Sequence, residues 1–406
     1  MGCFVVAPIQ QVSADEVGQY EVLEAQVAAL QKYIERHFVS HEEKILSLVE
    51  LRTTISAGTD WLVRAQEDNG HFAYEYAPYE GIYLDDDHVV RQAGTLYQLG
   101  EFARRDSNGV TRVSDAIESS VEYLDSLSEE GTYKDISFKC ITDSVNSSRC
   151  QLGATSLAVL GILGYVEGGQ GDIFAYEDRI EDYLNYIMAM KKEDAGFIGF
   201  FRTNWSSQSE VESSFSNGEA LLALVRYYQY KPRDDVKNMI DETFAYLEAK
   251  EFETPLYLWI MAALKDMQVL WPDVRYIAYA QEFTNMRRGS LIRAHNTEKN
   301  YCATTEGLVS AYGVLENNIS ESELLLLRKE IDFWNTHNSI LQITPVDRYR
   351  LVKEDGVFSI KMLPDSTQAQ GGFLTSGSVM TQRIDYTQHC VSAYIQTLVD
   401  IEGEEL

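Results

Sequence analysis

Four segments of the chain share one layout, in which a polar lead-in reaches a glycine and an apolar run follows at helical spacing. The glycines are Gly94, Gly153, Gly218 and Gly307. Two further segments, 254–267 and 385–399, repeat the apolar run without the glycine. Because such runs are apolar on most faces, each predicts a buried helix. Glycine costs a helix about 1 kcal/mol relative to alanine, so its recurrence indicates close helix packing.

Amphipathic segments alternate with these buried ones. Each has one apolar stripe and one charged face, and the segments are 48–66, 113–127, 176–192, 234–250, 272–286 and 320–337. A single helical hairpin cannot bury its apolar face alone, so repeated hairpins stack on their neighbours. We therefore predict an all-α fold, an (α/α)6 toroid of six helical hairpins with small β-hairpin loops on one rim. Residues 41–406 are expected to form this single domain, and residues 1–40 an N-terminal segment with an added helix.

The loops that lead into the buried helices are rich in glycine and aromatic residues. They span 66–83, 128–139, 192–205 and 347–376, whereas the connections on the opposite side are plainer. The four loops that lead into the buried helices should gather over the N-termini of these inner helices. Loops held on a rigid scaffold commonly carry binding and catalysis. The sequence therefore predicts a functional site at this rim.

The charge balance limits the partners that the protein can have. The net charge of its 406 residues is −29 and the isoelectric point is near 4.6. Such a surface repels nucleic acid and anionic membranes. No apolar stretch reaches the roughly 18 residues of a membrane span, so we expect neither nucleic-acid binding nor an integral membrane span.

The cysteines and the N-terminus bear on location. Cys140 and Cys150 flank a polar loop and could pair in an oxidising compartment. The N-terminus, "MGCFVVAPIQQVSADE", is compatible with a truncated signal or with a lipid anchor at Cys3. These features favour an extracellular or periplasmic location over a cytoplasmic one.

The stretch "YLDDDHVVRQAG" carries more charge than a helix start requires. One acceptor side chain is enough to cap a helix, but Asp85, Asp86 and Asp87 are followed by His88 and Arg91. A cation is disfavoured at a helix N-terminus. Arg91 should therefore pair with a neighbouring acid or bind a carboxylate of the substrate, and a salt bridge within the protein is the alternative explanation.

Closure of the ring should bring this stretch beside "RIDYTQH", which opens the last inner helix. Asp86 or Asp87 would then face Asp385. Two close carboxyl groups cannot both ionise freely, so one would act as general acid and the other as base or nucleophile. Glu212, from the third hairpin, is the reserve partner. Arg91, Arg383 and His389 would set the protonation of the pair.

Further candidates complete the expected site. Tyr386 and His389 could exchange a proton with a substrate. The expected substrate-binding residues are Tyr83, His88, Arg91, Arg149, Trp205, Tyr301, Glu306 and Arg383. Cys302, His389, Cys390 and the "DDDH" run could supply zinc ligands. His389 and Cys390 are adjacent, however, so they point about 100° apart on a helix and would rarely share one ion. We expect no metal and no other cofactor.

The segments "DNGHF", "DAGF" and "GGF" before inner helices resemble the six-hairpin glycosidase-like superfamily. The string "RIDYTQHCVSAYIQ" is similar to the end of glucuronyl C5-epimerases, which maps the likeness onto Arg383, Asp385 and Tyr386. "QEDNGHF" is also similar to the repeats of prenyltransferases and terpene cyclases, but "DDDH" does not match the spacing of their acidic signature.

The first resemblance implies a carbohydrate-active enzyme without a cofactor. Its leading form is a glycoside hydrolase-like enzyme that uses paired carboxylates on an oligo- or polysaccharide, with uronic-acid polymers among the candidates. One alternative is a uronyl C5-epimerase or polysaccharide lyase that transfers protons through tyrosine and histidine. Another is a non-catalytic glycan-binding or assembly protein.

Overall fold

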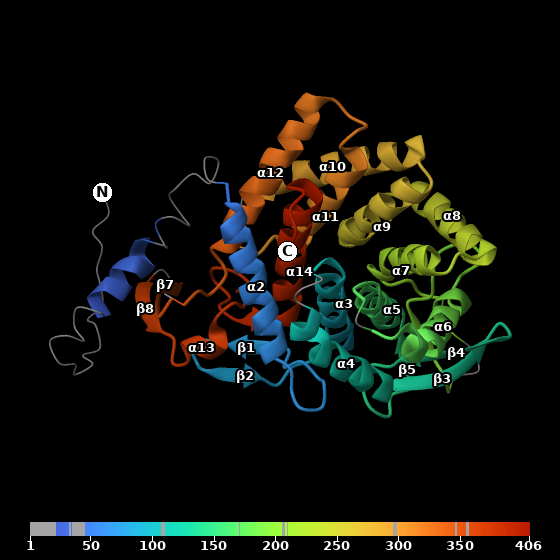
Figure 1. Cartoon of the computed structure of the whole chain (residues 1–406), viewed down its shortest axis with the longest axis horizontal. Coiled ribbons are helices and arrows are strands. Elements are labelled where there is room, and N and C mark those ends of the chain that lie inside the picture. Colours follow the sequence, from blue (N-terminus) through green and yellow to red (C-terminus); the bar gives the residue numbers. More distant parts are fainter. Residues whose placement is uncertain are drawn as a thin grey trace.

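The structure is a computed structural model that describes residues 22–31, 34, 45–106, 110–169, 171–204, 208, 210–294, 299–345, 347–354 and 357–406. In this part of the chain, helices form two layers (Figure 1). The inner layer consists of α3 (Val89–Arg105), α5 (Leu152–Glu167), α7 (Ser216–Tyr230), α9 (Tyr257–Leu270), α11 (Cys302–Leu315) and α14 (Ile384–Gln396). The outer layer consists of α2 (Leu48–Arg64), α4 (Val110–Ser126), α6 (Ile173–Ala189), α8 (Asp234–Glu248), α10 (Val274–Ala294) and α12 (Glu321–Ser339).

The inner helices form a closed ring. Each packs against the next along the chain, and α14 packs against α3. The outer helices cover this ring, with α2 on α14 and α12 on α11. Local signals start some of them: Ser47 and Glu50 form a capping box before α2, as Ser320 and Glu323 do before α12. The predicted (α/α)6 toroid is confirmed.

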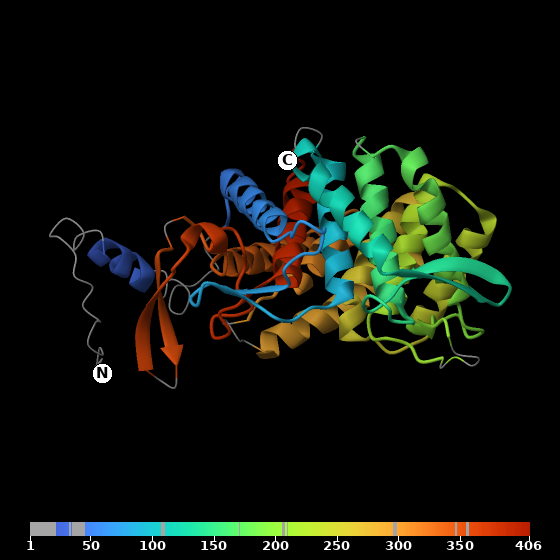
Figure 2. The same ribbon diagram turned by 90° about the horizontal axis from the view of Figure 1, so that it is seen from below.

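Small sheets lie in the loops that lead into inner helices (Figure 2). The strands are β1 (Glu75–Ala77), β2 (Ile82–Leu84), β3 (Ser128–Tyr133), β4 (Ile136–Ile141), β5 (Arg149–Gln151), β6 (Phe200–Arg202), β7 (Tyr349–Glu354), β8 (Val357–Met362) and β9 (Gln382–Arg383). Strand β1 pairs antiparallel with β2 and with β9, and Glu75 is opposite Arg383. This pairing joins the first rim loop to the last, so the starts of α3 and α14 are neighbours. Shorter elements are a 3₁₀ turn at Thr254–Leu256, α13 (Ser366–Ala369) and a π-helical turn at Thr397–Ile401.

The glycines that revealed the repeat are buried in the inner layer, as predicted. A Cβ atom at Gly94 would clash with the side chain of Gln388, and one at Gly307 would clash with the ring of Tyr257. Helices α3 and α5 also approach closely, because a Cβ atom at Gly100 would overlap the carbonyl oxygen of Gly161. Glycine lets these helices pack backbone to backbone.

Buried and partly buried ion pairs connect the inner helices near their C-terminal ends. Arg226 of α7 binds Glu101 of α3 at 3.3 Å and also pairs with Asp266 of α9. Asp400 binds Arg105 at 2.6 Å and Lys265 at 2.8 Å. These groups are held as pairs because an isolated buried charge is costly. The network connects helices on different sides of the ring.

Within the described residues, two disulfide bonds are formed. Cys140 and Cys150 are paired with Cα atoms 5.6 Å apart, the pairing that the sequence left open. Cys302 and Cys390 are also paired, with Cα atoms 4.6 Å apart, and this bond links the start of α11 to α14. None of the described helices has both the length and the apolar character of a membrane span.

Removing the Cys302–Cys390 bond by a Cys302→Ser/Cys390→Ser double substitution is expected to lower the free energy of unfolding by roughly 4 kcal/mol. The bond closes a loop of 88 residues, whereas Cys140–Cys150 closes one of 10. A Cys140→Ser/Cys150→Ser variant, the matched control, should lose less, because loop-closure entropy grows with loop length. Urea titration measures both. An equal or smaller loss from the 302/390 variant would contradict the expectation.

Candidate active site

Each inner helix places one distinctive residue in its first two turns. These residues are Arg91, Gly153, Glu219, Trp259, Glu306 and His389, which we call the first-turn layer. They are connected around the ring. Arg91 acts electrostatically on Glu219, and the rings of Trp259 and His389 are 6.1 Å apart. Further along α3 toward its C-terminus, Tyr97 packs against Trp259 of α9, with ring centroids 5.9 Å apart.

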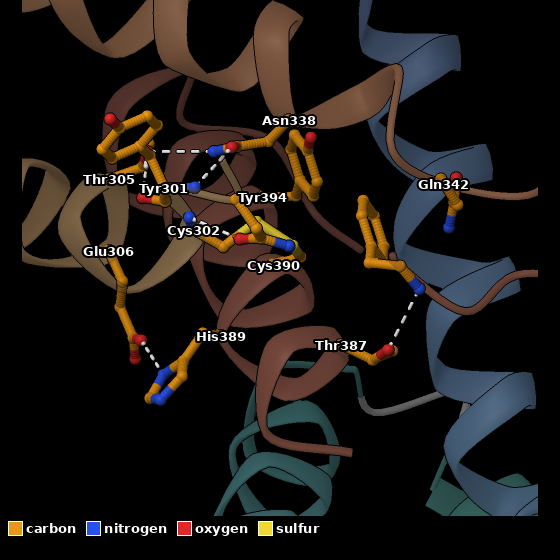
Figure 3. The surroundings of a disulfide bond; sticks show 12 residues. Tyr301, Cys302, Thr305, Glu306, Asn338, Gln342, Thr387, His389, Cys390 and Tyr394 are labelled. Carbon is orange, nitrogen blue, oxygen red and sulfur yellow. Dashed lines mark hydrogen bonds and ion pairs between the residues drawn. A yellow bond between two sulfur atoms is a disulfide. The ribbon is translucent and has the colours of Figure 1, made fainter. Parts of the chain in front are cut away.

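His389 and Glu306 form a hydrogen-bonded pair. Nδ1 of His389 lies 2.8 Å from Oε2 of Glu306, and Ser392 donates to Oε1 of Glu306 at 2.6 Å. Figure 3 shows the two side chains pointing toward each other from α14 and α11. Glu306 lies one turn after Cys302 and His389 is next to Cys390, the two cysteines of the disulfide. Within the described residues, Nε2 of His389 makes no hydrogen bond. A histidine oriented at one nitrogen by a carboxylate can exchange a proton at the other.

Asp385 is held by two arginines. Arg383 donates to both of its oxygens, at 3.0 and 2.6 Å, and Nε of Arg91 lies 3.4 Å from Oδ2. The guanidinium of Arg383 also lies over the rings of Tyr74 and Tyr386, 4.9 and 5.1 Å from their centroids. Burial, helped by the Asp385 carboxylate, raises the pKa of Tyr74 to about 12. The structure thus brings Arg91, Arg383, Asp385 and Tyr386 together at the junction of α3 and α14.

The acidic run lies just before α3 and is exposed. Oδ1 of Asp87 accepts hydrogen bonds from the backbone of His88 and from the side chain of Gln92, both at 2.7 Å, and Nε2 of His71 is 3.3 Å away. Asp87 is only partly desolvated, which acts to raise its pKa, but the bonds from His71 and Gln92 outweigh this effect and hold that pKa below its ordinary value. Asp86 accepts from the backbone of Asp87 at 2.9 Å. These contacts brace the start of α3.

Glu212 is surrounded by donors. Lys192 and Lys250 approach its carboxylate at 2.9 and 3.1 Å, Asn217 donates at 2.8 Å, and Tyr246 also donates. Burial acts to raise the pKa of Glu212, but the bonds from Tyr246, Lys192 and the other donors lower it to about 2. This carboxylate holds the loop before α7 to α8.

Two expected binding residues contact other parts of the protein. Arg149 binds Asp143 at 3.1 Å and lies 3.9 Å from the centroid of the Phe200 ring. Tyr301 precedes α11 and packs on Trp334, with ring centroids 4.4 Å apart.

The remaining expected binding residues are Tyr83, His88 and Trp205. Tyr83 is exposed on β2, where its hydroxyl accepts from Gln368. His88 is the residue before α3, and partial desolvation together with the charge of Arg91 lowers its pKa. Trp205 lies outside the described residues. In the part of the chain that the structure describes, no three His, Cys, Asp or Glu side chains cluster as metal ligands would.

Sequence reasoning missed Glu219. This residue of α7 is 3% exposed. Burial raises its pKa to about 7, although Arg91 acts in the opposite direction. A Cβ atom at Gly153 would overlap Oε2 of Glu219, so glycine at that position makes room for the carboxyl group. The available signal was a single acid in the otherwise apolar start of "NGEALLALV".

Comparison with known proteins identifies the architecture. No protein-family model matches the chain, and no curated protein sequence matches it. Solved structures do match. A family 76 glycoside hydrolase (mannosidase) from Bacteroides thetaiotaomicron has a TM-score of 0.59 at 10% identity, covering 87% of this chain and 100% of its own. A sugar epimerase from a ruminal bacterium has a TM-score of 0.59 at 11% identity, covering 87% and 99%. An unsaturated glucuronyl hydrolase specific for heparin has a TM-score of 0.55 at 9% identity, covering 88% and 98%.

The chain has the fold of the six-hairpin glycosidase-like superfamily. The match spans most of both chains in each case, which confirms the fold predicted from the sequence. Identities this low establish the fold alone, because one fold can host unrelated activities. Within this six-hairpin ring, function has to be argued from the first-turn layer and the residues beside it.

Proposed function

We propose that this protein is a carbohydrate-active enzyme in which His389 moves a proton. The observation that carries the proposal is the 2.8 Å contact between Nδ1 of His389 and Glu306 inside the first-turn layer. The pair comes from two neighbouring inner helices that the Cys302–Cys390 bond ties together. A base oriented by a second group is the usual arrangement for proton abstraction.

The reaction that fits this pair best is epimerisation or isomerisation of a sugar. Nε2 of His389 would remove a proton from the carbon beside a carbonyl or carboxylate group, and a proton returned to the other face, or to the neighbouring carbon, would complete the reaction. No oxidant or cofactor is needed. The sugar epimerase and a D-mannose isomerase with the same fold, TM-score 0.57 at 10% identity, support this class.

Hydrolysis of a glycosidic bond is the second candidate. Asp385 at the junction of α3 and α14 favours it, because a carboxylate at the rim can activate water. To complete the predicted carboxylate pair, Asp86 or Asp87 would have to give up its present contacts and bind the substrate instead. The likeness to mannosidase and glucuronyl hydrolase structures supports this candidate.

Arg91 and Arg383 favour an acidic sugar among the possible substrates. Both are already near Asp385, and guanidinium groups can bind a further carboxylate in two-pronged fashion. The two disulfides of the described residues support an extracellular or periplasmic location, since such bonds persist in oxidising compartments.

Product analysis tests the reaction class. The protein is incubated in D₂O with mannan, cellobiose, mannose and unsaturated heparin disaccharides. We expect deuterium in the recovered sugar without chain cleavage. New reducing ends would instead support hydrolysis, and absorbance of a new unsaturated bond would support lyase chemistry. Binding of a glycan without any of these products would favour a non-catalytic glycan-binding protein and contradict the proposal.

A further inference from the structure

We infer that Glu219 is the general acid of this site and donates a proton to a substrate oxygen while His389 acts on carbon. This inference rests on the proposed function and adds a residue to it. Glu219 belongs to the first-turn layer, on α7, whereas His389 belongs to α14. Trp259 connects the two: its ring lies 6.1 Å from that of His389, and its Cβ atom packs against Gly218, the residue before Glu219.

Other buried carboxylates of the ring have partners. Glu101 is bound by Arg104 and Arg226, and Glu306 is bound by His389 and Ser392. Within the described residues, the carboxyl group of Glu219 makes no hydrogen bond and no ion pair. Buried polar groups in proteins are almost always satisfied, so an unpaired acid in this position points to a ligand or to a role in catalysis.

The surroundings of Glu219 leave room for its carboxyl group and give it no paired cation. Gly153 of α5 leaves the space that Oε2 occupies. Arg91 acts electrostatically on Glu219, but its ion pair is with Asp385, whose Oδ2 lies 3.4 Å from Nε of Arg91. Burial without a paired cation keeps the carboxyl protonated up to a pKa of about 7. A carboxyl group in that state can donate a proton at neutral pH.

The proton and electron balance closes without a further reactant. Nε2 of His389 removes the proton from carbon, and the electron pair of that C–H bond forms a C=C bond. The electron pair of the carbonyl π bond takes the proton from Glu219, which gives an enediol. The Glu219 carboxylate then takes the proton of the neighbouring enediol hydroxyl, and the electron pair of that O–H bond forms the new C=O bond. The electron pair of the C=C bond takes the proton from Nε2 of His389 at the other carbon, which gives the isomerised sugar. Glu219 and His389 each end the cycle as they began it.

The test compares Glu219→Gln and Glu219→Asp with the wild-type protein on the substrate found by product analysis. Glutamine has nearly the same shape but no acidic proton, so kcat should fall by about 10²-fold or more with KM changed by only a few-fold. The limb of the pH–rate profile near pH 7, where wild-type activity falls as Glu219 loses its proton, should disappear. Aspartate should restore part of kcat and that limb. Glu316→Gln, an exposed position at the end of α11, is the control and should match the wild type.

Infrared titration gives a readout that needs no substrate. The wild-type protein should show a protonated-carboxyl band that disappears as the pH rises through about 7 and that is absent from Glu219→Gln. Absence of such a band from the wild type overturns the inference, as does a Glu219→Gln variant with near-normal kcat and an unchanged pH profile. A wild-type protein that turns over none of the sugars fails the proposed function, and the inference falls with it.

Discussion

Replacing His389 by asparagine is expected to lower kcat by about 10²- to 10⁴-fold while the melting temperature changes little. The side chain is the proton carrier of the proposed reaction, and its Nδ1 is already committed to Glu306. Asparagine keeps a polar group near Glu306 but cannot accept and return a proton at Nε2. Steady-state kinetics on the identified sugar, with thermal unfolding of each variant, measures the effect.

Glu306→Gln should have a smaller effect on kcat and should shift the pH–rate profile, because an amide can orient the imidazole but cannot stabilise the imidazolium. His71→Asn is the control: His71 braces Asp87 outside the first-turn layer, so kcat should stay within a few-fold of the wild type. If His389→Asn folds and keeps near-normal kcat, His389 is not the base. That result would favour the second candidate function, hydrolysis with Asp385 as the carboxylate.

Replacing Arg226 by methionine is expected to lower the free energy of unfolding by about 3–5 kcal/mol. Arg226 is buried between Glu101 and Asp266, and its loss leaves one buried and one partly buried carboxylate of like charge short of a partner. Methionine fills similar volume without polar atoms, so packing changes little. Urea denaturation measures the loss. Arg275→Met is the matched control, because Arg275 makes exposed pairs with Asp273 and Glu248 that contribute about 0–1 kcal/mol.

The same substitution should change the dependence of stability on pH. Burial acts to raise the pKa of Glu101, but Arg104 and Arg226 outweigh it and hold the pKa well below its ordinary value. Its contribution to stability is therefore fully present above the unfolded-state pKa, near 4.3, and is lost as the pH falls through the folded-state pKa. Arg226→Met should flatten this acid limb. A loss under about 1 kcal/mol, with the acid limb unchanged, would show that Arg104 and Arg105 hold Glu101 by themselves.

The sequence determined the helices and their layers. Apolar residues on most faces of 91–103 or 150–163 require burial on all sides, whereas the single stripe of 176–192 requires burial on one side only. Alternation of the two kinds leaves few arrangements besides a ring of hairpins. The buried glycines followed from the same reasoning, since glycine within a helix is tolerated where another backbone approaches closely.

Only the tertiary structure decided which side chains meet. The sequence predicts that the starts of the first and last inner helices are neighbours. The β1–β9 pairing and the Arg91–Asp385 contact show that they are. The sequence predicts Asp86 or Asp87 opposite Asp385, whereas the contacts of Asp385 in the structure are with Arg91 and Arg383. Several acids and arginines lie at those helix starts, and rotation about a helix axis selects among them. Cys302 and Cys390 are far apart in sequence, and their pairing depends on the register of α11 against α14. Glu219 lay unnoticed in an apolar helix, because its burial and its lack of a partner arise from contacts between helices that local periodicity does not encode.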